Sequence, residues 1–262
     1  MSTRFYEGLP QKIMVVKFGT KNLSSPAVFA DYARQIEEAW GGGRGTIVVS
    51  SGAILHGWNR MNALGADLPY LDLDELISHA ISPFLGQEEL AGIGSRHLLN
   101  AWGEAFAVYS KEVGQIWVTN ANLSDEGERK SIGLRILNYL KAGVIPIINE
   151  NDVVSSAEIR WMEQGISEND RLARKIAELV GADWILFLTD TEGVYEEDPS
   201  KNLQARLYEE IASTDVTPGS QTISSGLLGR GGMKAKIEEA IQCFRAGMRV
   251  AIAGNQKDAI LK

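Results

Sequence analysis

Short, uninterrupted apolar runs alternate with helix-like segments along most of this chain. The first run covers residues 13–18, and residues 29–40 then place apolar side chains at helical spacing. The same alternation recurs to the end of the sequence. Strands that are apolar on both faces are typical of a parallel sheet with helices on both sides. The alternation therefore predicts an α/β fold whose central sheet is mainly parallel.

The elements can be placed along the chain from this pattern. Strands are expected at residues 13–18, 46–50, 115–119, 144–149, 184–189 and 249–253. Helices are expected at residues 29–40, 98–113, 132–141, 172–180 and 233–246, with a further helix-like segment after Gly52. Residues 64–87 are irregular and partly acidic, so we expect a loop or a pair of short helices there. Pro146 should make the N-terminal part of its strand irregular or leave that part at an edge, because proline has no N–H to donate.

Composition limits the class of protein. The chain has 262 residues, of which 44% are hydrophobic, enough for a sizeable core in one large domain or two lobes. A net charge of −8 and a pI of about 5.1 argue against general binding to nucleic acid or to a membrane surface. Cys243 is the single cysteine, which allows no disulfide within the chain and no cysteine-based zinc site. The histidines lack metal-ligand spacing, so no protein metal site is expected.

No apolar stretch is long enough to span a membrane, and residues 1–7 lack the core of a signal peptide. With the single cysteine, these features favour a cytoplasmic protein. No internal repeat or linker is visible, so we expect one domain over residues 1–262.

Polar residues follow four of the predicted strands. They are Lys17, Ser50-Ser51, residues 149–152 (Asn-Glu-Asn-Asp) and Thr189-Asp190. Open α/β sheets bind their ligands at the carboxyl ends of the strands. Four strands that deliver polar residues to one edge therefore predict a ligand site at that edge.

These residue types suit phosphate chemistry. A lysine before Gly19 can meet a phosphate, and a Ser51-Gly52 turn at the start of a helix offers N–H donors to an anion. Residues 226–236 are rich in glycine, carry Arg230, Lys234 and Lys236, and open a helix without the Gly-Lys-Ser/Thr of a Walker loop. Each segment taken alone also fits an ordinary surface turn. Together they indicate a phosphoryl transferase without a Walker loop.

Other polar residues have more than one reading. Consecutive amides and carboxylates at residues 149–152 are costly to bury unless they bind something, although they also fit a polar loop. Asp170 could cap the following helix, orient the lysines or coordinate a metal.

In their order along the chain, these blocks resemble the amino acid kinase family from about residue 12 to residue 254. Residues 189–199 (Thr-Asp-Thr-Glu-Gly-Val-Tyr-Glu-Glu-Asp-Pro) match a block shared widely in that family. Residues 49–53, 144–153 and 229–236 most resemble its glutamate 5-kinase branch. The resemblance implies a three-layer α/β/α sandwich, with a substrate lobe over about residues 1–170 and a nucleotide lobe over about residues 171–262.

The resemblance also implies an activity. It implies transfer of the ATP γ-phosphoryl group to the side-chain carboxylate of L-glutamate, with Mg²⁺, as the first step of proline synthesis. Proline is then a candidate feedback inhibitor, and a homo-oligomer is expected. Many members of this branch carry a C-terminal PUA domain, for which we expect no counterpart in these residues.

The resemblance assigns a role to each matching residue. Lys17 and Lys236 would stabilise charge on the transferring phosphoryl group, and Asp170 would hold both lysines. Glutamate would be bound by Ser51, Gly52, Asn151, Asp152 and Asn169. ATP would be bound by Thr189, Asp190, Tyr195, Asp198, Gly229, Arg230, Gly231, Gly232, Met233 and Lys236.

Some positions depart from the family pattern. Gly94-Ser95 stands where a Gly-Gln pair is usual, and Ser167-Glu168 precedes Asn169-Asp170 where Gly-Asp is usual, after a longer stretch at residues 161–166. Arg230 and Lys234 add charge to the glycine-rich loop. Two alternatives therefore stay open: a kinase of the same fold that acts on another carboxylate, a carbamate or a phosphate monoester, and a non-catalytic nucleotide or amino-acid sensor.

Overall fold

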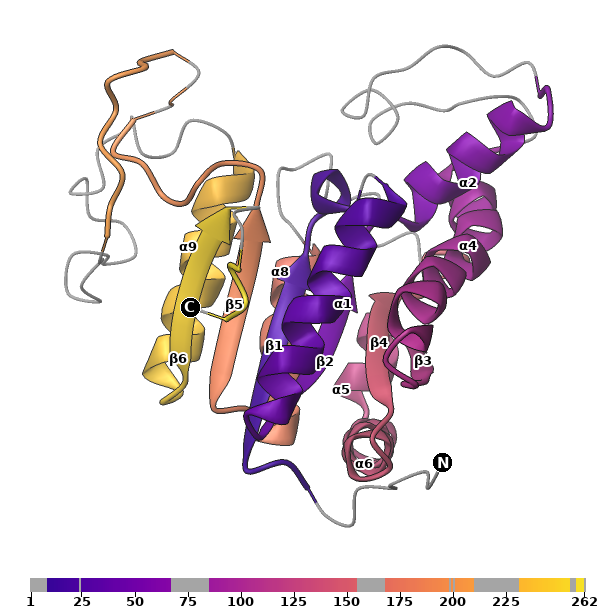
Figure 1. Cartoon of the computed structure of the whole chain (residues 1–262), viewed down its shortest axis with the longest axis horizontal. Helices are drawn as coiled ribbons and strands as arrows, with labels where there is room; N and C mark the ends of the chain where they lie inside the picture. The colour runs from indigo at the N-terminus through magenta and orange to yellow at the C-terminus, as the bar shows by residue number, and fades with distance from the viewer. Residues whose placement is uncertain are drawn as a thin grey trace.

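The computed structural model describes residues 9–23, 25–66, 85–154, 168–197, 199, 201–209, 231–254 and 258–261 (Figure 1). Its centre is a six-stranded sheet in the order β3-β4-β2-β1-β5-β6, and every pair of neighbours is parallel. The strands are β1 (Lys12–Phe18), β2 (Arg44–Ser50), β3 (Val113–Val118), β4 (Ile145–Glu150), β5 (Trp184–Thr189) and β6 (Arg249–Gly254). The predicted α/β fold with a mainly parallel sheet is confirmed.

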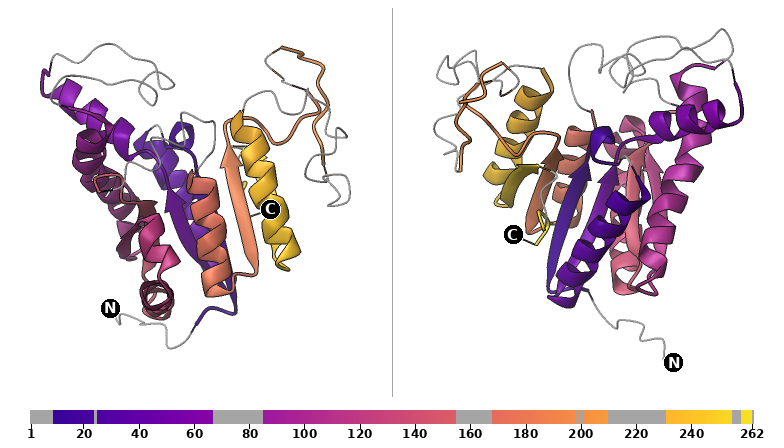
Figure 2. Two further views of the ribbon diagram at one scale, coloured as in Figure 1. Left: turned by 180° about the vertical axis from the view of Figure 1, so that it is seen from behind. Right: turned by 45° about the horizontal axis from the view of Figure 1, so that its top comes forward.

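Helices cover both faces of the sheet (Figures 1 and 2). On one face α1 (Pro26–Gly41) packs against α4 (Gln87–Ala107). On the other face α8 (Glu168–Val180) packs between α6 (Glu126–Lys141) and α9 (Gly231–Arg245). The shorter helices are η1 (Thr20–Asn22), α2 (Ala53–Ala63) and α5 (Asn120–Ser124). Burial on both faces explains why β1, β2, β4 and β5 are almost continuously apolar.

The course of the chain through the sheet reverses beside β1. From β1 the chain moves to β2 and on to β3 and β4 on one side, and then crosses to β5 and β6 on the other. Lys17 therefore lies opposite Val49 of β2 and opposite Phe187 of β5. Such a reversal point is where open α/β sheets most often bind ligands, outside the carboxyl ends of the strands.

Glycines set the boundaries of the first helix and the second. α1 ends at Gly41, and Gly43 turns the chain toward β2 with φ of 83°. Gly52 precedes α2 with φ of 106°, a left-handed conformation that costs glycine least. The predicted helix at residues 29–40 and the helix-like segment after Gly52 are therefore confirmed.

β4 is an interior strand between β3 and β2, but its first residues, Ile145 and Pro146, pair with β3 alone. The expectation that Pro146 leaves the N-terminal part of its strand at an edge is therefore confirmed. The N–H of Ile145 points toward β3, where it donates to the carbonyl of Glu112. Backbone groups alternate sides along a strand, so the nitrogen of Pro146 faces β2. Pairing with β2 begins only at Ile147, and the missing N–H therefore breaks no ladder bond there.

Two helix predictions need new boundaries. The helix expected at residues 98–113 is α4, which begins at Gln87 and ends at Ala107, and Val113 already belongs to β3. The helix expected at residues 132–141 begins earlier, at Glu126, where the Asp125 carboxylate caps the N–H of Glu128 at 2.8 Å. Most of the loop predicted at residues 64–87 lies outside the described residues.

An aromatic cluster fills the core between the sheet and helices α1 and α4. Phe18 makes edge contacts with Tyr32 and Trp102, and Phe29 meets Trp102 in the same way. Burial raises the pKa of the Tyr32 hydroxyl far above its ordinary range. None of the helices in the described ranges combines the length and the apolar character needed to cross a membrane.

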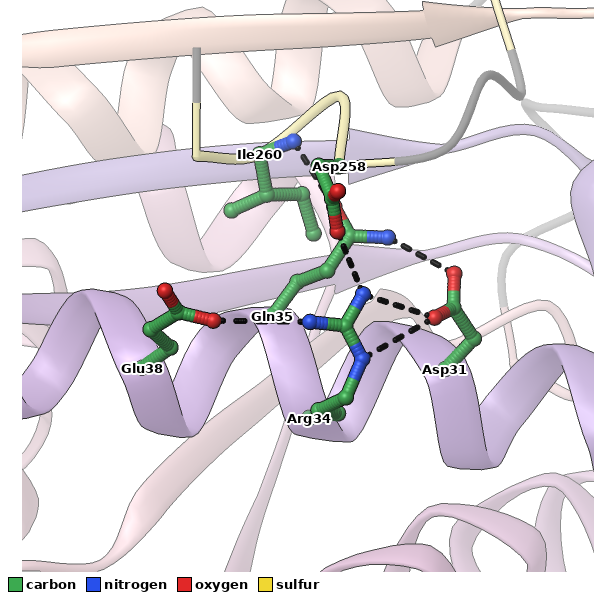
Figure 3. Close-up of polar contacts among 6 residues, drawn as sticks. All are labelled: Asp31, Arg34, Gln35, Glu38, Asp258 and Ile260. Carbon is green, nitrogen blue, oxygen red and sulfur yellow. Dashed lines mark hydrogen bonds and ion pairs between the residues drawn. The ribbon is translucent and has the colours of Figure 1, made fainter.

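The turn at residues 258–261 is fastened to α1 (Figure 3). The Arg34 guanidinium bridges the Asp31 and Asp258 carboxylates. The buried Gln35 amide donates to Asp31 at 2.8 Å and accepts the N–H of Ile260 at 2.9 Å. These bonds hold Ile260 against the core.

Candidate active site

Buried polar side chains gather at the carboxyl edge of the sheet. Lys17, Ser50, Asn149, Glu150 and Thr189 end four different strands, and each is less than a tenth exposed. Neighbouring pairs in the register bring these strand ends together, since Lys17 is opposite Val49, and Val49 is opposite Ile148. The sequence therefore predicted correctly that four strands deliver polar groups to one edge.

Lys17 and Lys236 both bind the carboxylate of Asp170. Lys17 Nζ lies 2.8 Å from Asp170 Oδ1, and Lys236 Nζ lies 2.9 Å from both Oδ1 and Oδ2. The Asp170 side chain is completely buried, and the lysine side chains are 6% and 8% exposed. Three elements that are distant in sequence thus form one compact charged cluster with a net charge of +1.

Alternation along β1 explains this geometry. Successive side chains of a strand point to opposite faces. Phe18 points to the face of α1 and α4, where it meets Tyr32 and Trp102. Lys17 points to the opposite face, where α8 carries Asp170. Asp170 lies in the first turn of α8, where the helix dipole favours a negative charge, so it serves the lysines from inside the helix.

The cluster shifts the ionisation of its members. Burial disfavours the charge of Asp170, but Lys17 and Lys236 outweigh it and lower the pKa of the carboxyl below its ordinary value. Burial, together with the charge of Lys17, lowers the pKa of Lys236 to about 8 despite Asp170. A cationic pair that is buried and exceeds its counter-ion by one charge is suited to bind an anion.

The turn after β2 is hydrogen-bonded to the end of β1 and to helix α4. The N–H of Ser51 donates to the carbonyl of Phe18 at 3.1 Å, which fixes the turn to the end of β1. Trp102 Nε1 donates to Ser50 Oγ at 3.2 Å, and Ser50 Oγ donates to the carbonyl of Ser51 at the same distance. Ser51 is half-buried, and Gly52 caps α2. These bonds fix the backbone that leads into α2.

A second polar group surrounds the end of β4. Asn149, Glu150, Asp152 and Asn169 are all nearly buried, and Asn169 precedes Asp170 on α8. Asn149 Oδ1 is buried and accepts no hydrogen bond within the described part of the chain. Asn151 is half-buried, and its N–H donates to the carbonyl of Val118 at 2.8 Å. Buried carboxylates and amides of this kind are costly unless they meet a polar partner.

The residues expected to contact a nucleotide are only partly assembled. Thr189 and Asp190 lie at the end of β5, with Thr189 Oγ1 3.3 Å from Asp190 Oδ1. Gly231, Gly232 and Met233 open α9, which carries Lys236. Tyr195 follows β5 and forms an antiparallel bridge with Leu207, and its hydroxyl donates to Glu192 at 3.1 Å. Asp198, Gly229 and Arg230, like residues 161–166, lie outside the described residues.

The sequence reasoning missed three side chains that brace this site. Trp102 holds Ser50, and Asn22 links the end of β1 to the end of β5. Arg174 of α8 pairs with Glu239 of α9, one helical turn beyond Asp170 and Lys236. An asparagine soon after Gly19 is a turn signal, but its distant partner cannot be read from spacing. The other two are ordinary core and helix-surface residues in sequence.

The departure at Gly94-Ser95 lies in a helix contact. A Cβ at Gly94 would come within 1.8 Å of the Ala53 carbonyl oxygen, and a Cβ at Gly57 within 2.0 Å of the Leu90 carbonyl oxygen. The buried Ser95 hydroxyl donates to the carbonyl of Ala91 in its own helix. These positions therefore allow α2 and α4 to cross closely.

Comparison with known proteins places these features in context. Residues 12–254 match the model of the amino acid kinase family. The chain is 34% identical over 257 residues to the glutamate 5-kinase of Shewanella halifaxensis, covering 94% of this chain and 63% of that protein. It is 33% identical to the glutamate 5-kinase of Haemophilus influenzae, covering 95% and 65%. The chain thus spans just under two thirds of these curated relatives.

Solved structures share the fold at lower identity. A carbamate kinase from Giardia lamblia bound to AMP-PNP superposes with a TM-score of 0.62 at 14% identity, over 93% of each chain. A UMP kinase from Ureaplasma parvum superposes with a TM-score of 0.57 at 15% identity, over 95% of this chain and 93% of that one. Both likenesses bear on the fold alone.

Proposed function

Because the chain belongs to the amino acid kinase family, we propose that it transfers the γ-phosphoryl group of ATP to the γ-carboxylate of L-glutamate. The product would be γ-glutamyl phosphate, the first intermediate of proline synthesis. The observation that carries the proposal is the convergence of Lys17 and Lys236 on Asp170 at the reversal point of the sheet. The choice of glutamate rests on the similarity to glutamate 5-kinases over 94–95% of the chain.

The reaction needs little covalent help from the protein. A γ-carboxylate oxygen attacks the γ-phosphorus, a new O–P bond forms, and the bond from that phosphorus to the bridging oxygen of ADP breaks. The carboxylate is already ionised at neutral pH, so no general base is required. Positioning and charge stabilisation then supply the catalysis. Lys17 and Lys236 are the cations we assign to the transferring phosphoryl group, and Asp170 holds them in place.

The buried polar group at the end of β4 is our proposed glutamate site. Asp152 would hold the α-ammonium group, and the amides of Asn151 and Asn169 would bind carboxylate oxygens. The N–H of Ser51 is already donated to Phe18, so the donors that we assign here are the backbone N–H groups of the first turn of α2, after Gly52. On this assignment, residues up to about 170 form the substrate lobe and the later residues form the nucleotide lobe.

ATP would bind at the end of β5. Thr189 and Asp190, with Gly231, Gly232 and Met233 at the start of α9, are the described residues that we assign to it, and Tyr195, Asp198, Gly229 and Arg230 remain assigned by resemblance. Mg²⁺ bound to ATP would neutralise charge on its phosphates. Asp190 carries a half-exposed carboxylate at this edge, a ligand type that suits Mg²⁺. Feedback inhibition by proline and assembly into a homo-oligomer are part of the same proposal.

Trapping the labile product tests the proposal directly. The protein is incubated with Mg-ATP, L-glutamate and hydroxylamine, and the hydroxamate and ADP are both measured. Glutamate-dependent hydroxamate in equal amount to ADP is the expected result. Lys17→Ala should lower the rate at least a hundredfold, because a cation that meets the transition state contributes several kcal/mol. ADP release with carbamate or a nucleoside monophosphate, and none with glutamate, would assign the site to another acceptor.

A further inference from the structure

Asn22 bridges the ends of two strands that are adjacent in the sheet but far apart in the chain. Its Oδ1 accepts the N–H of Gly19 at 3.2 Å, at the turn that follows β1. Its Nδ2 donates to the carbonyl of Thr189 at 3.1 Å, at the end of β5. The residue is only 2% exposed, so both bonds are made away from water.

The bridge lies where the path of the chain reverses. β1 and β5 are neighbours, and Lys17 pairs with Phe187 two residues before Thr189. One end of the bridge is therefore fixed to the turn after Lys17, and the other to Thr189 and Asp190. A second, weaker link runs alongside, since Lys21 Nζ lies 3.7 Å from Asp190 Oδ2 with both side chains substantially exposed.

Gly19 takes part in this contact in an unexpected way. A glycine directly after a strand-end lysine would be expected to let a phosphate approach the backbone. A Cβ at Gly19 would instead lie 3.1 Å from Asn22 Oδ1, and the Gly19 N–H is already donated to that oxygen. Gly19 has an ordinary φ of −78°, so its value here is the space that it leaves for the amide.

We infer that Asn22 is a positioning residue that sets the distance between the turn at Gly19, which follows Lys17, and the nucleotide-binding end of β5. The inference rests on the proposed function for the identity of the ligand. Asn22 touches no reacting atom on this view. It acts by holding the Thr189 carbonyl, and with it Asp190, against the turn that follows Lys17.

Two variants of similar size remove different parts of the bridge. Asn22→Leu removes both bonds. Asn22→Asp keeps an acceptor for Gly19 but places a carboxylate oxygen against the Thr189 carbonyl, which repels it. In both variants we expect the Kd for AMP-PNP with Mg²⁺, measured by calorimetry, to rise about tenfold or more. The KM for glutamate should stay within about twofold, because the end of β4 is not part of the bridge.

Gln35 provides the matched control. It is also a fully buried amide that donates once and accepts once, and it fastens residues 258–261 to α1 (Figure 3). Gln35→Leu should lower the urea midpoint of unfolding about as much as Asn22→Leu, yet leave the Kd for AMP-PNP within about twofold. Comparison of the two variants separates loss of a buried amide from loss of this bridge.

The outcomes are distinct. Normal AMP-PNP affinity in folded Asn22→Asp, or equal weakening in Gln35→Leu, would overturn the inference. If Asn22→Leu fails to fold, Asn22→Asp still decides, and Asn22→Ser provides a smaller variant that lacks the amide donor. If the wild type binds AMP-PNP but forms no glutamyl hydroxamate, the glutamate assignment fails while the Kd comparison still tests Asn22.

Discussion

Lys236 binds both carboxylate oxygens of Asp170 at 2.9 Å, although the two residues come from different helices separated by a strand in the chain. Lys17 reaches the same carboxylate from the sheet. One acid therefore orients two cations, and neither cation is neutralised completely. This shared contact determines how the site should respond to pH and to substitution.

The first prediction concerns the pH dependence of activity. Burial lowers the pKa of Lys236 to about 8 in the free protein. If the charged form serves the phosphoryl group, kcat/KM for ATP should fall about tenfold per pH unit above that value. Lys236→Arg should have a lower rate but lose this decline, because arginine stays charged. The same decline in that variant would assign the titration to another group.

The lowered pKa of Lys236 does not destabilise the folded protein at high pH, so unfolding caused by this residue does not explain the fall in kcat/KM. The unfolded chain keeps the lysine proton up to its ordinary pKa of 10.5, whereas the folded protein releases it near 8. Between these values the unfolded state binds more protons, so the contribution of Lys236 to the free energy of unfolding rises with pH. The difference in the free energy of unfolding between wild type and Lys236→Arg, measured with urea at pH 8 and at pH 9.5, should therefore shift in favour of the wild type as the pH rises, while the activity of the wild type falls.

The second prediction concerns Asp170→Asn. The substitution leaves two buried ammonium groups without their shared counter-ion, and the free energy of unfolding should fall by about 3–5 kcal/mol. Urea denaturation near neutral pH measures the change. Glu126→Gln is the matched control, since Glu126 pairs with Lys130 at the surface with its side chain 70% exposed. That exposed pair should contribute less than about 1 kcal/mol. Similar losses in the two variants would contradict the buried cluster.

The third prediction concerns Arg174 and Glu239, whose side chains are 19% and 20% exposed. They repeat the contact between α8 and α9 with the charges exchanged, one turn beyond Asp170 and Lys236. Arg174→Ala should cost about 1–3 kcal/mol and lower kcat, because α9 is then less firmly placed. The double variant Arg174→Glu with Glu239→Arg exchanges the two charges, and it should recover part of the stability and part of the kcat that each of these single variants loses. If the losses in the double variant equal the sum of the two single losses, the pair does not place Lys236.

The fourth prediction concerns the crossing of α2 and α4. Gly94→Ala would push a methyl group into the Ala53 carbonyl, and we expect a loss of about 1–3 kcal/mol from overpacking. Among the described residues, a Cβ at Gly103 on the same helix would meet Val113 alone, at an ordinary contact distance of 3.6 Å. Gly103→Ala should therefore be neutral or stabilising by up to about 1 kcal/mol. Thermal unfolding of both variants measures the contrast. If Gly103→Ala also destabilises the protein, the loss in Gly94→Ala must be attributed to a general effect of alanine in α4 and not to the crossing with α2.

The strands were predictable because burial on both faces leaves a direct signature in sequence. β5 was predicted with its observed ends, and β2 within two residues. Pro146 was also interpreted correctly, because its missing N–H faces a position where the ladder with β2 has not yet begun. α4 was placed too late, since its glycines and small residues at the α2 contact weaken the apolar pattern that marks a helix.

The site was predictable to a different degree. Parallel topology brings strand ends together, so the gathering of Lys17, Ser50, Asn149 and Thr189 followed from sequence. That Asp170 binds both lysines was implied by family resemblance, and only tertiary structure shows its geometry. Asn22 could not be predicted, because its partner Thr189 becomes a neighbour only when β5 pairs with β1.

The position of β1 also has a consequence for the order of folding. β1 is made first among the described strands, yet one of its two neighbours, β5, is synthesised only after β2, β3, β4 and α8. Until then β1 keeps an open edge. Lys236, which shares Asp170 with Lys17, is synthesised later still, with α9. Pairings between such distant segments form slowly, because a long loop must close first. The charged cluster is thus completed late, and a nascent chain should not form it before α9 has been made.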